Sequence, residues 1–192
     1  MRPDWISVVK FRYVRDWDNP ALDKWLCALA AAGAVVRASS VAPRVDLVRN
    51  REVGRWLAED ATKYLLMVDS DMVPLAETNA LLIEPGDALW CPYVDQAGKV
   101  IDPQVNGVGT GCMRISRGLA EAVPEPRFEY VLGADGKTVV KSEAFTFTEK
   151  AAAAGFAFRA VGRAGHLMRL VALPPGPGHE AVEWKFEWEF WD

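Results

Sequence analysis

Five largely apolar residues, Tyr64 to Val68, run without polar alternation into Asp69, Ser70 and Asp71. A continuous apolar run of this length is typical of a strand covered on both faces, as in a parallel sheet with helices above and below it. The stretch therefore predicts an α/β fold with a mostly parallel central sheet. The rest of the chain must supply the neighbouring strands and the helices that cover them.

The two carboxylates at the end of this strand predict a metal site. Ligands of open α/β sheets bind beyond the carboxyl ends of the strands, and side chains two apart in an extended segment point the same way. Asp69 and Asp71 would then face one cation. Hard oxygen ligands favour Mg²⁺ or Mn²⁺, with a diphosphate in the open positions. Turn chemistry before Pro74 and a predicted helix at 75–83 is the alternative.

Composition indicates one compact domain spanning residues 1–192. Apolar residues make up 51% and charged residues 25% of the chain, which suits a sizeable core. The N-terminus lacks an apolar signal region, and no stretch approaches the roughly 20 apolar residues that span a bilayer. We therefore expect a cytoplasmic protein without a membrane contact. Cys27, Cys91 and Cys112 lack metal-type spacing and are expected to be buried thiols.

The positions of the charged residues along the chain are more informative than the net charge. A net charge of −4 argues against a generic nucleic-acid binder. Residues 150–179 nevertheless carry four basic side chains and no acidic one, whereas residues 180–192 carry five acids and one lysine. The basic segment either lines a site for an anionic substrate or is a solvated basic face. Its cations are Lys150, Arg159, Arg163 and Arg169.

The opening of the chain predicts a βαβ unit. Residues 5–11 are rich in β-branched and aromatic side chains and predict a first strand. A helix follows, with Asn19 as its cap, Pro20 in the first helical position and Gly33 at its end. Residues 34–41 predict the second strand, and the crossover should be right-handed.

Further elements follow from hydrophobic periodicity and turn residues. Residues 182–190 alternate aromatic or aliphatic with charged side chains, which predicts an antiparallel edge strand. This aromatic tail would lie on the body of the protein or join two copies as a homodimer. The other predicted elements are helices at 46–60 and 142–155 (capped by Ser142), strands at 87–93, 156–161 and 166–173, and a hairpin at 127–141 about the Asp135-Gly136 turn.

Two further features suggest contact with an anion. Arg49 lies in the first turn of the helix at 46–60, where the helix dipole disfavours a cation unless something negative is near. Snorkelling into solvent is the alternative for this side chain. Gly109, Thr110 and Gly111 form a glycine-spaced loop that enters a strand. The glycines allow close backbone approach to a ligand, or form a bulge, and they do not match the dinucleotide-binding fingerprint.

Together these pieces resemble the glycosyltransferase A fold, a Rossmann-like three-layer sandwich, and in particular the compact glycosyltransferase 2 type of bacteria and phages. The resemblance covers roughly residues 45–170. It is carried, in order, by Val48-Arg49-Asn50-Arg51, by Leu66-Met67-Val68-Asp69-Ser70-Asp71-Met72 as the Asp-x-Asp motif, by Gly109-Thr110-Gly111-Cys112-Met113 leading to Arg117, and by Ser142-Glu143 with Phe147 and Gly155, followed by His166.

The resemblance implies roles for the site residues. Asp71 would bind Mn²⁺ or Mg²⁺ directly, Asp69 would face the nucleotide or the metal, and His166 would complete the metal site. The metal would act as a Lewis acid on the leaving diphosphate. Further donor-binding groups would be Arg49, Ser70 and the segment Gly109-Thr110-Gly111.

The catalytic base is the point where the chain departs from the family. Members commonly carry a Glu-Asp pair at the start of the helix after the hairpin, and this chain has Glu143-Ala144. Glu143 is therefore the expected base for the acceptor hydroxyl, with Glu149 a poorer substitute. A purely structural role for Glu143 in the first helical turn is the alternative.

The expected activity is an inverting transfer of a hexose from a UDP-glucose-like nucleotide sugar to an acceptor hydroxyl. The acceptor would be a hydroxymethylated base in phage DNA, a glycan or a protein. A nucleotidyltransferase is the enzymatic alternative, although no glycine- and lysine-rich phosphate loop follows Val9-Lys10-Phe11-Arg12. A catalytically inactive module that binds through the same fold is the non-enzymatic alternative, and Ala144 favours it.

Overall fold

A computed structural model describes residues 5–12, 19–39, 44–94 and 108–166 of the 192-residue chain. The predicted aromatic edge strand at 182–190, and with it the predicted homodimer contact, lies outside the described residues. So do most of the predicted strand at 166–173 and the basic residue Arg169.

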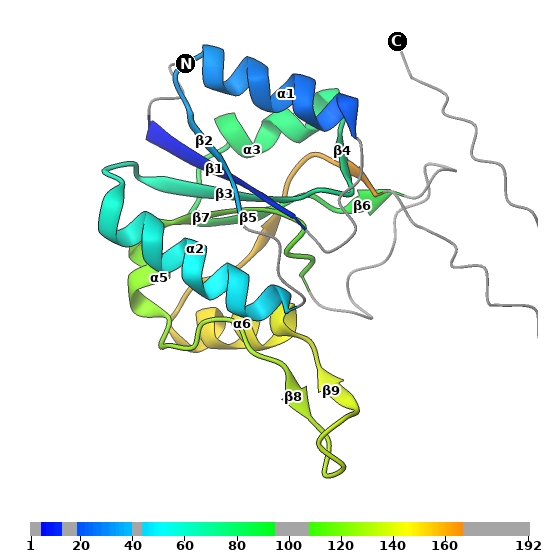
Figure 1. Ribbon diagram of the computed structural model, residues 1–192. Coiled ribbons are helices and arrows are strands. Elements are labelled where there is room, and N and C mark those ends of the chain that lie inside the picture. The colour runs from blue at the N-terminus through cyan, green and yellow to red at the C-terminus, as the bar shows by residue number, and fades with distance from the viewer. Residues whose placement is uncertain (1–4, 13–18, 40–43, 95–107, 167–192) are drawn as a thin grey trace, which may run out of the picture.

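The central sheet is mostly parallel, as predicted. Its six strands lie in the order β10-β5-β7-β3-β1-β2 (Figure 1). Only β7 runs opposite to its two neighbours, β3 and β5, within this sheet. The parallel contacts join β1 to β2, β1 to β3 and β10 to β5. The strands are β1 (Ile6–Phe11), β2 (Val35–Ala38), β3 (Tyr64–Asp69), β5 (Ala88–Trp90), β7 (Cys112–Ser116) and β10 (Arg159–Ala160).

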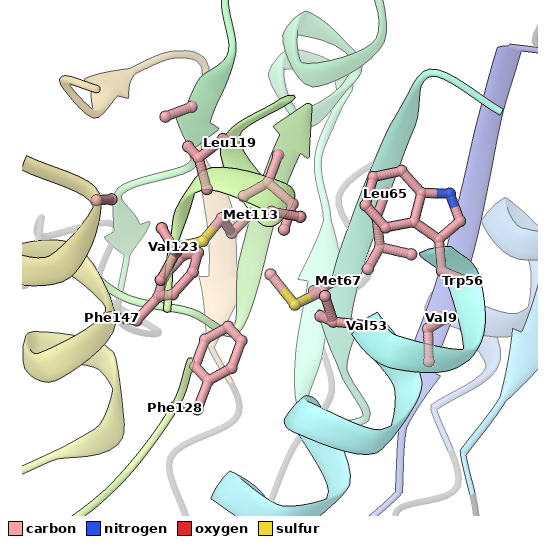
Figure 2. Packing of buried hydrophobic residues seen from close by; sticks show 14 of the residues in the cluster. Val9, Val53, Trp56, Leu65, Met67, Met113, Leu119, Val123, Phe128 and Phe147 are labelled. Atoms are coloured by element: carbon pink, nitrogen blue, oxygen red, sulfur yellow. The ribbon is translucent and has the colours of Figure 1, made fainter. Parts of the chain in front are cut away.

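Helices cover both faces of this sheet. Figure 1 shows α1 and α3 on one face and α2, α5 and α6 on the other. Alternate residues of β3 therefore enter different cores: Leu66 packs with the α1 side, and Leu65 and Met67 pack with the α2 side (Figure 2). The apolar run is buried on both faces, as predicted. The helices are α1 (Pro20–Ala31), α2 (Val45–Glu59), α3 (Ala80–Ile83), α5 (Arg117–Ala122) and α6 (Glu143–Ala153).

The residues that mark the start and the end of α1 are the predicted ones. The side-chain oxygen of Asn19 accepts a hydrogen bond from the Leu22 amide at 3.1 Å, and Pro20 occupies the first turn. Gly33 has φ +107°, a backbone conformation that favours glycine. In α6, Ser142 is the N-cap residue, as predicted, but its side chain makes no capping hydrogen bond. Cys91 and Cys112 are buried, whereas Cys27 on α1 is exposed, contrary to the prediction.

A second, three-stranded sheet was not predicted. It consists of β4 (Met72–Pro74), β11 (Ala164–His166) and β6 (Tyr93–Val94), with β11 in the middle. The predicted helix at 75–83 is instead a 3₁₀ turn, Ala76–Asn79, followed by the short α3. The predicted strand at 87–93 is divided between β5 and β6, because the chain leaves the large sheet at Pro92, which has no amide hydrogen to pair.

The hairpin β8 (Val131–Leu132) and β9 (Val139–Lys141) projects from the α6 side of the body (Figure 1). Its turn is the predicted one, with Gly136 at φ +65° and the Asp135 carboxylate accepting from the Lys137 and Thr138 amides. No helix in the described ranges is both long and apolar enough to cross a bilayer.

Candidate functional site

The two carboxylates lie at the carboxyl end of β3 but have different partners. Asp69 is the last residue of β3, and the chain turns at Ser70 and Asp71 before it enters β4. Alternation of side chains holds only in an extended segment, so the turn breaks it. As a result, Asp69 pairs with Arg49 of helix α2, and Asp71 faces His166 of the small sheet. The expectation that Asp69 and Asp71 lie in one extended segment is therefore wrong, whereas a cation shared by both stays a prediction.

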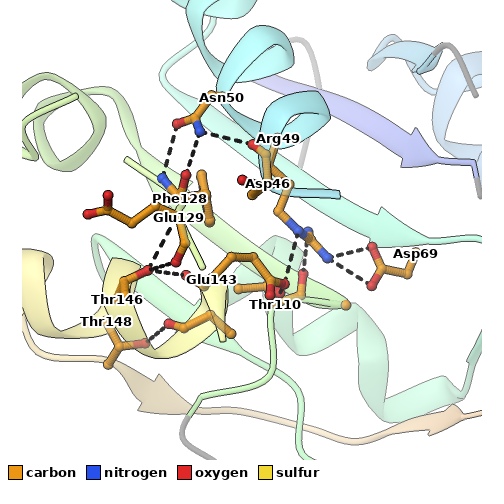
Figure 3. A network of polar contacts seen from close by, with 12 residues as sticks. Asp46, Arg49, Asn50, Asp69, Thr110, Phe128, Glu129, Glu143, Thr146 and Thr148 are labelled. Atoms are coloured by element: carbon orange, nitrogen blue, oxygen red, sulfur yellow. Dashed lines mark hydrogen bonds and ion pairs between the residues drawn. The ribbon is translucent and has the colours of Figure 1, made fainter. Parts of the chain in front are cut away.

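Arg49 and Asp69 form a buried ion pair. Nη2 of Arg49 donates to both carboxylate oxygens of Asp69 at 2.9 Å, and Nη1 donates to the Thr110 carbonyl at 3.1 Å (Figure 3). The guanidinium also lies over the Phe11 ring, 4.9 Å from its centroid. Arg49 is 1% exposed, so it does not snorkel. The anion expected near Arg49 is therefore the carboxylate of Asp69 in the same chain.

Glu143 lies against this ion pair. Its Oε1 accepts from the Thr110 hydroxyl at 3.5 Å and stands 3.8 Å from Nε of Arg49 (Figure 3). Burial first, and the negative charge of Glu143 second, raise the pKa of Tyr130 to about 12. The proposed substitute Glu149 is instead exposed and pairs with Lys141 of β9. Of the two carboxylates, the structure brings only Glu143 to Arg49.

Asp71 and His166 meet at the edge of the small sheet. Oδ2 of Asp71 stands 3.6 Å from Nε2 of His166, and the two side chains are 21% and 28% exposed. Within the described part of the chain, Oδ1 of Asp71 and Nδ1 of His166 are buried without a hydrogen-bond partner. Burial first, and the charge of Asp69 second, raise the pKa of Asp71. Each of the two side chains therefore has one buried polar atom that no described residue satisfies.

Tyr93 holds the glycine loop and His166 together, and sequence reasoning missed it. The Gly111 amide donates to the Tyr93 hydroxyl at 2.5 Å, and the Tyr93 ring stacks on His166 with 5.5 Å between centroids. A Cβ on Gly109 or Gly111 would lie 2.4 or 2.8 Å from that hydroxyl. The glycines allow close approach, as predicted, but the approaching group is Tyr93. Its position at the end of a predicted strand was the only signal in the sequence.

The remaining predicted donor-binding groups are buried or hydrogen-bonded within the chain. Ser70 is fully buried, and its hydroxyl finds no partner among the residues the structure describes. Thr110 is 4% exposed and bonds to Glu143 and Arg49, while the Gly111 amide is engaged by Tyr93. The structure therefore brings all the predicted site residues to one end of β3. They form two groups, one around Arg49 and one around His166.

The Asp71–His166 pair fits a divalent cation as part of its ligand set. Across the described ranges, no three His, Cys, Asp or Glu side chains are gathered to hold a metal ion. The Asp71 carboxylate suits Mn²⁺ or Mg²⁺, whereas the His166 imidazole suits a transition metal better than Mg²⁺, and such ions commonly take further ligands from water and phosphate. The two unpartnered buried atoms are the observation in favour of this fit.

Comparison with solved structures shows the fold. "A197 from STIV" is similar over 85% of this chain and 86% of that chain, with a TM-score of 0.57 and 17% identity. A glycosyltransferase involved in the glycosylation of the major capsid of PBCV-1 is similar over 60% of this chain and 62% of that one. Its TM-score of 0.37 and identity of 13% make it too distant for an argument. No protein-family model and no curated protein sequence matches the chain.

Proposed function

We propose that this chain is a metal-dependent glycosyltransferase that moves a hexose from a nucleotide sugar such as UDP-glucose to an acceptor hydroxyl. The observation that carries the proposal is the Asp71–His166 pair, with an unpartnered buried atom on each side chain, beside the buried Arg49–Asp69 pair. The site stands at the carboxyl end of a strand in a mostly parallel sheet, where α/β folds bind ligands. The resemblance of the sequence to the glycosyltransferase A fold agrees with this position.

Each residue has a separate role in this proposal. Asp71 and His166 hold Mn²⁺ or Mg²⁺, which when bound neutralises charge on the leaving diphosphate. Arg49 fixes the carboxylate of Asp69, so that this carboxylate is oriented to accept from a hydroxyl of the nucleotide. Glu143 accepts the proton of the acceptor hydroxyl as that oxygen attacks the sugar carbon, and the nucleoside diphosphate departs.

The test is a thermal-shift screen of the full chain with nucleotide sugars, with and without Mn²⁺. A ligand that binds only the folded state stabilises it by about 2.7 kcal/mol at a hundred times its dissociation constant. We expect a shift with a uridine diphosphate sugar only when Mn²⁺ is present, and slow hydrolysis of that donor. Asp71→Asn should abolish both effects while the far-UV circular dichroism stays unchanged. A shift and turnover with nucleoside triphosphates instead would favour a nucleotidyltransferase.

Ala144 beside Glu143 favours the second candidate, a catalytically inactive binding module. Glu143→Gln separates the two. If Glu143 is the base, the variant binds donor and Mn²⁺ as the unmodified chain does but transfers no sugar. If the unmodified chain binds the donor, and a broad acceptor panel gives no transfer, the chain is a binding module.

The acceptor is proposed as a hydroxyl compound, with a hydroxymethylated DNA base as one case beside glycans and proteins. Two cations of the predicted basic segment are already paired, Lys150 with Glu129 and Arg159 with Glu84. Their availability for phosphates is reduced accordingly. Binding to modified DNA must weaken as salt rises if phosphate contacts contribute, and salt-independent binding would exclude this acceptor.

A further inference from the structure

Asn19 connects the start of α1 to the turn that carries Asp71. It is 1% exposed, and each side-chain atom is used. Its Oδ1 accepts from the Leu22 amide at 3.1 Å, which caps α1. Its Nδ2 donates to the carbonyl of Ser70 at 3.1 Å and to the carbonyl of Met72 at 2.8 Å. These two carbonyls lie immediately before and after Asp71.

The amide of Asn19 thereby fixes the backbone on both sides of Asp71. The preceding residues are also held, because the Ser70 amide donates to the Phe11 carbonyl at 3.0 Å and the Asp69 amide donates to the Gly111 carbonyl at 2.7 Å. On the far side, Met72 pairs with His166 in the β4–β11 ladder. The same amide therefore holds the backbone of the turn from which Asp71 extends beside His166.

We propose that Asn19 is a positioning residue for a divalent cation held between Asp71 and His166. The inference rests on the proposed function, because Asn19 has a positioning role only if Asp71 and His166 bind a metal ion. Outer partners that orient metal ligands contribute strongly to metal affinity, and their loss typically weakens binding about 10- to 100-fold. Only the side-chain NH₂ group of Asn19 contacts the turn that carries Asp71. The side-chain oxygen of Asn19 caps α1 instead.

Asn19→Asp separates the two tasks. A carboxylate still accepts from the Leu22 amide and is favourable at a helix N-terminus, but it cannot donate to the two carbonyls. We expect isothermal titration of the full chain with Mn²⁺, alone and with uridine diphosphate, to give a dissociation constant about 10- to 100-fold higher than that of the unmodified chain. The electron paramagnetic resonance spectrum of the bound Mn²⁺ should change as well, which a general loss of stability would not cause.

Asn50→Asp is the matched control. The Asn50 side chain also donates to two carbonyls, those of Asp46 at 2.9 Å and Phe128 at 2.6 Å, and accepts from the Phe128 amide at 3.0 Å. The variant loses the same kinds of hydrogen bond away from the Asp71 turn. It should lower the melting temperature while the Mn²⁺ dissociation constant stays unchanged. If it weakens Mn²⁺ binding as much as Asn19→Asp does, the effect is general and the inference fails.

Asn19→Ser gives a second route if the aspartate variant does not fold. Serine is a good helix cap without an amide, so its Mn²⁺ binding should be weakened in the same way. If the unmodified chain binds Mn²⁺ and the folded Asn19 variants bind it equally well, only the role of Asn19 is overturned. If the unmodified chain takes up no Mn²⁺ with or without uridine diphosphate, the proposed function fails, and the positioning role fails with it.

Discussion

Gly111 has little room for a side chain in the candidate site. A Cβ there would lie 2.8 Å from the Tyr93 hydroxyl, 3.0 Å from Oδ2 of Asp69 and 3.2 Å from the Met72 sulfur. Gly111→Ala should therefore lower the free energy of unfolding by about 1–3 kcal/mol, as overpacking of a filled interior does. Urea unfolding of the full chain measures the change.

Gly54→Ala is the control for this substitution. Gly54 lies inside α2, and a Cβ there meets nothing within 4 Å. Alanine should raise the free energy of unfolding by about 0.5–1 kcal/mol, because glycine is the poorer helix former. Equal effects of the two substitutions would contradict the close approach of Tyr93 and Asp69 to the glycine loop.

Asp71 should make the metal-free protein sensitive to pH. Its pKa in the folded chain is raised above the ordinary 3.8, by burial first and by Asp69 second. Stability from the protonated form is therefore complete below the unfolded pKa and is lost as pH rises through the folded pKa. Metal-free Asp71→Asn should melt higher than the unmodified chain near neutral pH, and the gap should close as pH falls toward about 4. Melting curves with a chelator test this, and a gap that widens on acidification would contradict it.

At the residue scale, sequence reasoning found the charged members of the site but not what holds them. Asp69 and Asp71 were recognisable because a buried strand that runs into two carboxylates has a local signature, whereas His166 and Glu143 were assigned only through the family resemblance. Tyr93 was missed, and Asn19 was recognised only as a cap. Tyr93 contacts Gly111, and Asn19 contacts the Ser70 and Met72 carbonyls. Each contact joins segments that are distant in the sequence, so no local sequence pattern predicts it.

The end of α2 depends on a side chain from α5. Arg117 donates to the Leu57 carbonyl at 3.0 Å and to the Trp56 and Thr62 carbonyls at 3.4 Å, and it also bonds to the Asp60 carbonyl. Arg117→Ala leaves these carbonyls without the donor and should lower the free energy of unfolding by about 2–3 kcal/mol.

Arg55→Ala is the matched arginine variant on α2. Arg55 makes an exposed i,i+4 pair with Glu59 at 2.8 Å, and exposed pairs contribute little. Its urea midpoint should match that of the unmodified chain. A loss as large as that of Arg117→Ala would mean that the carbonyl contacts of Arg117 do not stabilise α2.

At the element scale, strong local signals predicted α1, α2, α6, β1, β3 and the hairpin at close to their observed bounds. The failures are short elements whose partners are distant in the chain. β4 has three residues and exists because β11 pairs with it. α5 is a six-residue helix capped by the Ser116 hydroxyl, too short for a periodic pattern to stand out. The secondary structure of these segments depends on contacts with distant residues more than on local sequence propensity.

The two cores share one sheet, so the whole molecule should unfold as a unit. Leu22 on the α1 side and Phe147 on the α6 side are both fully buried. Leu22→Ala should cost about 2–5 kcal/mol and Phe147→Ala about 3–5 kcal/mol. Because the two side chains lie in different cores, the double variant should lose the sum of both, in one transition seen alike by tryptophan fluorescence and far-UV circular dichroism. Two separate transitions would show that the cores unfold independently.

The middle position of β11 in the small sheet has a consequence for how the protein is made. β4 and β6 each pair with β11, which lies far downstream of both in the chain. A nascent polypeptide can bring Arg49 and Asp69 together well before the ribosome has released His166. A nascent chain should therefore bind a cation only after His166 has left the ribosome, and not when Arg49 and Asp69 first meet.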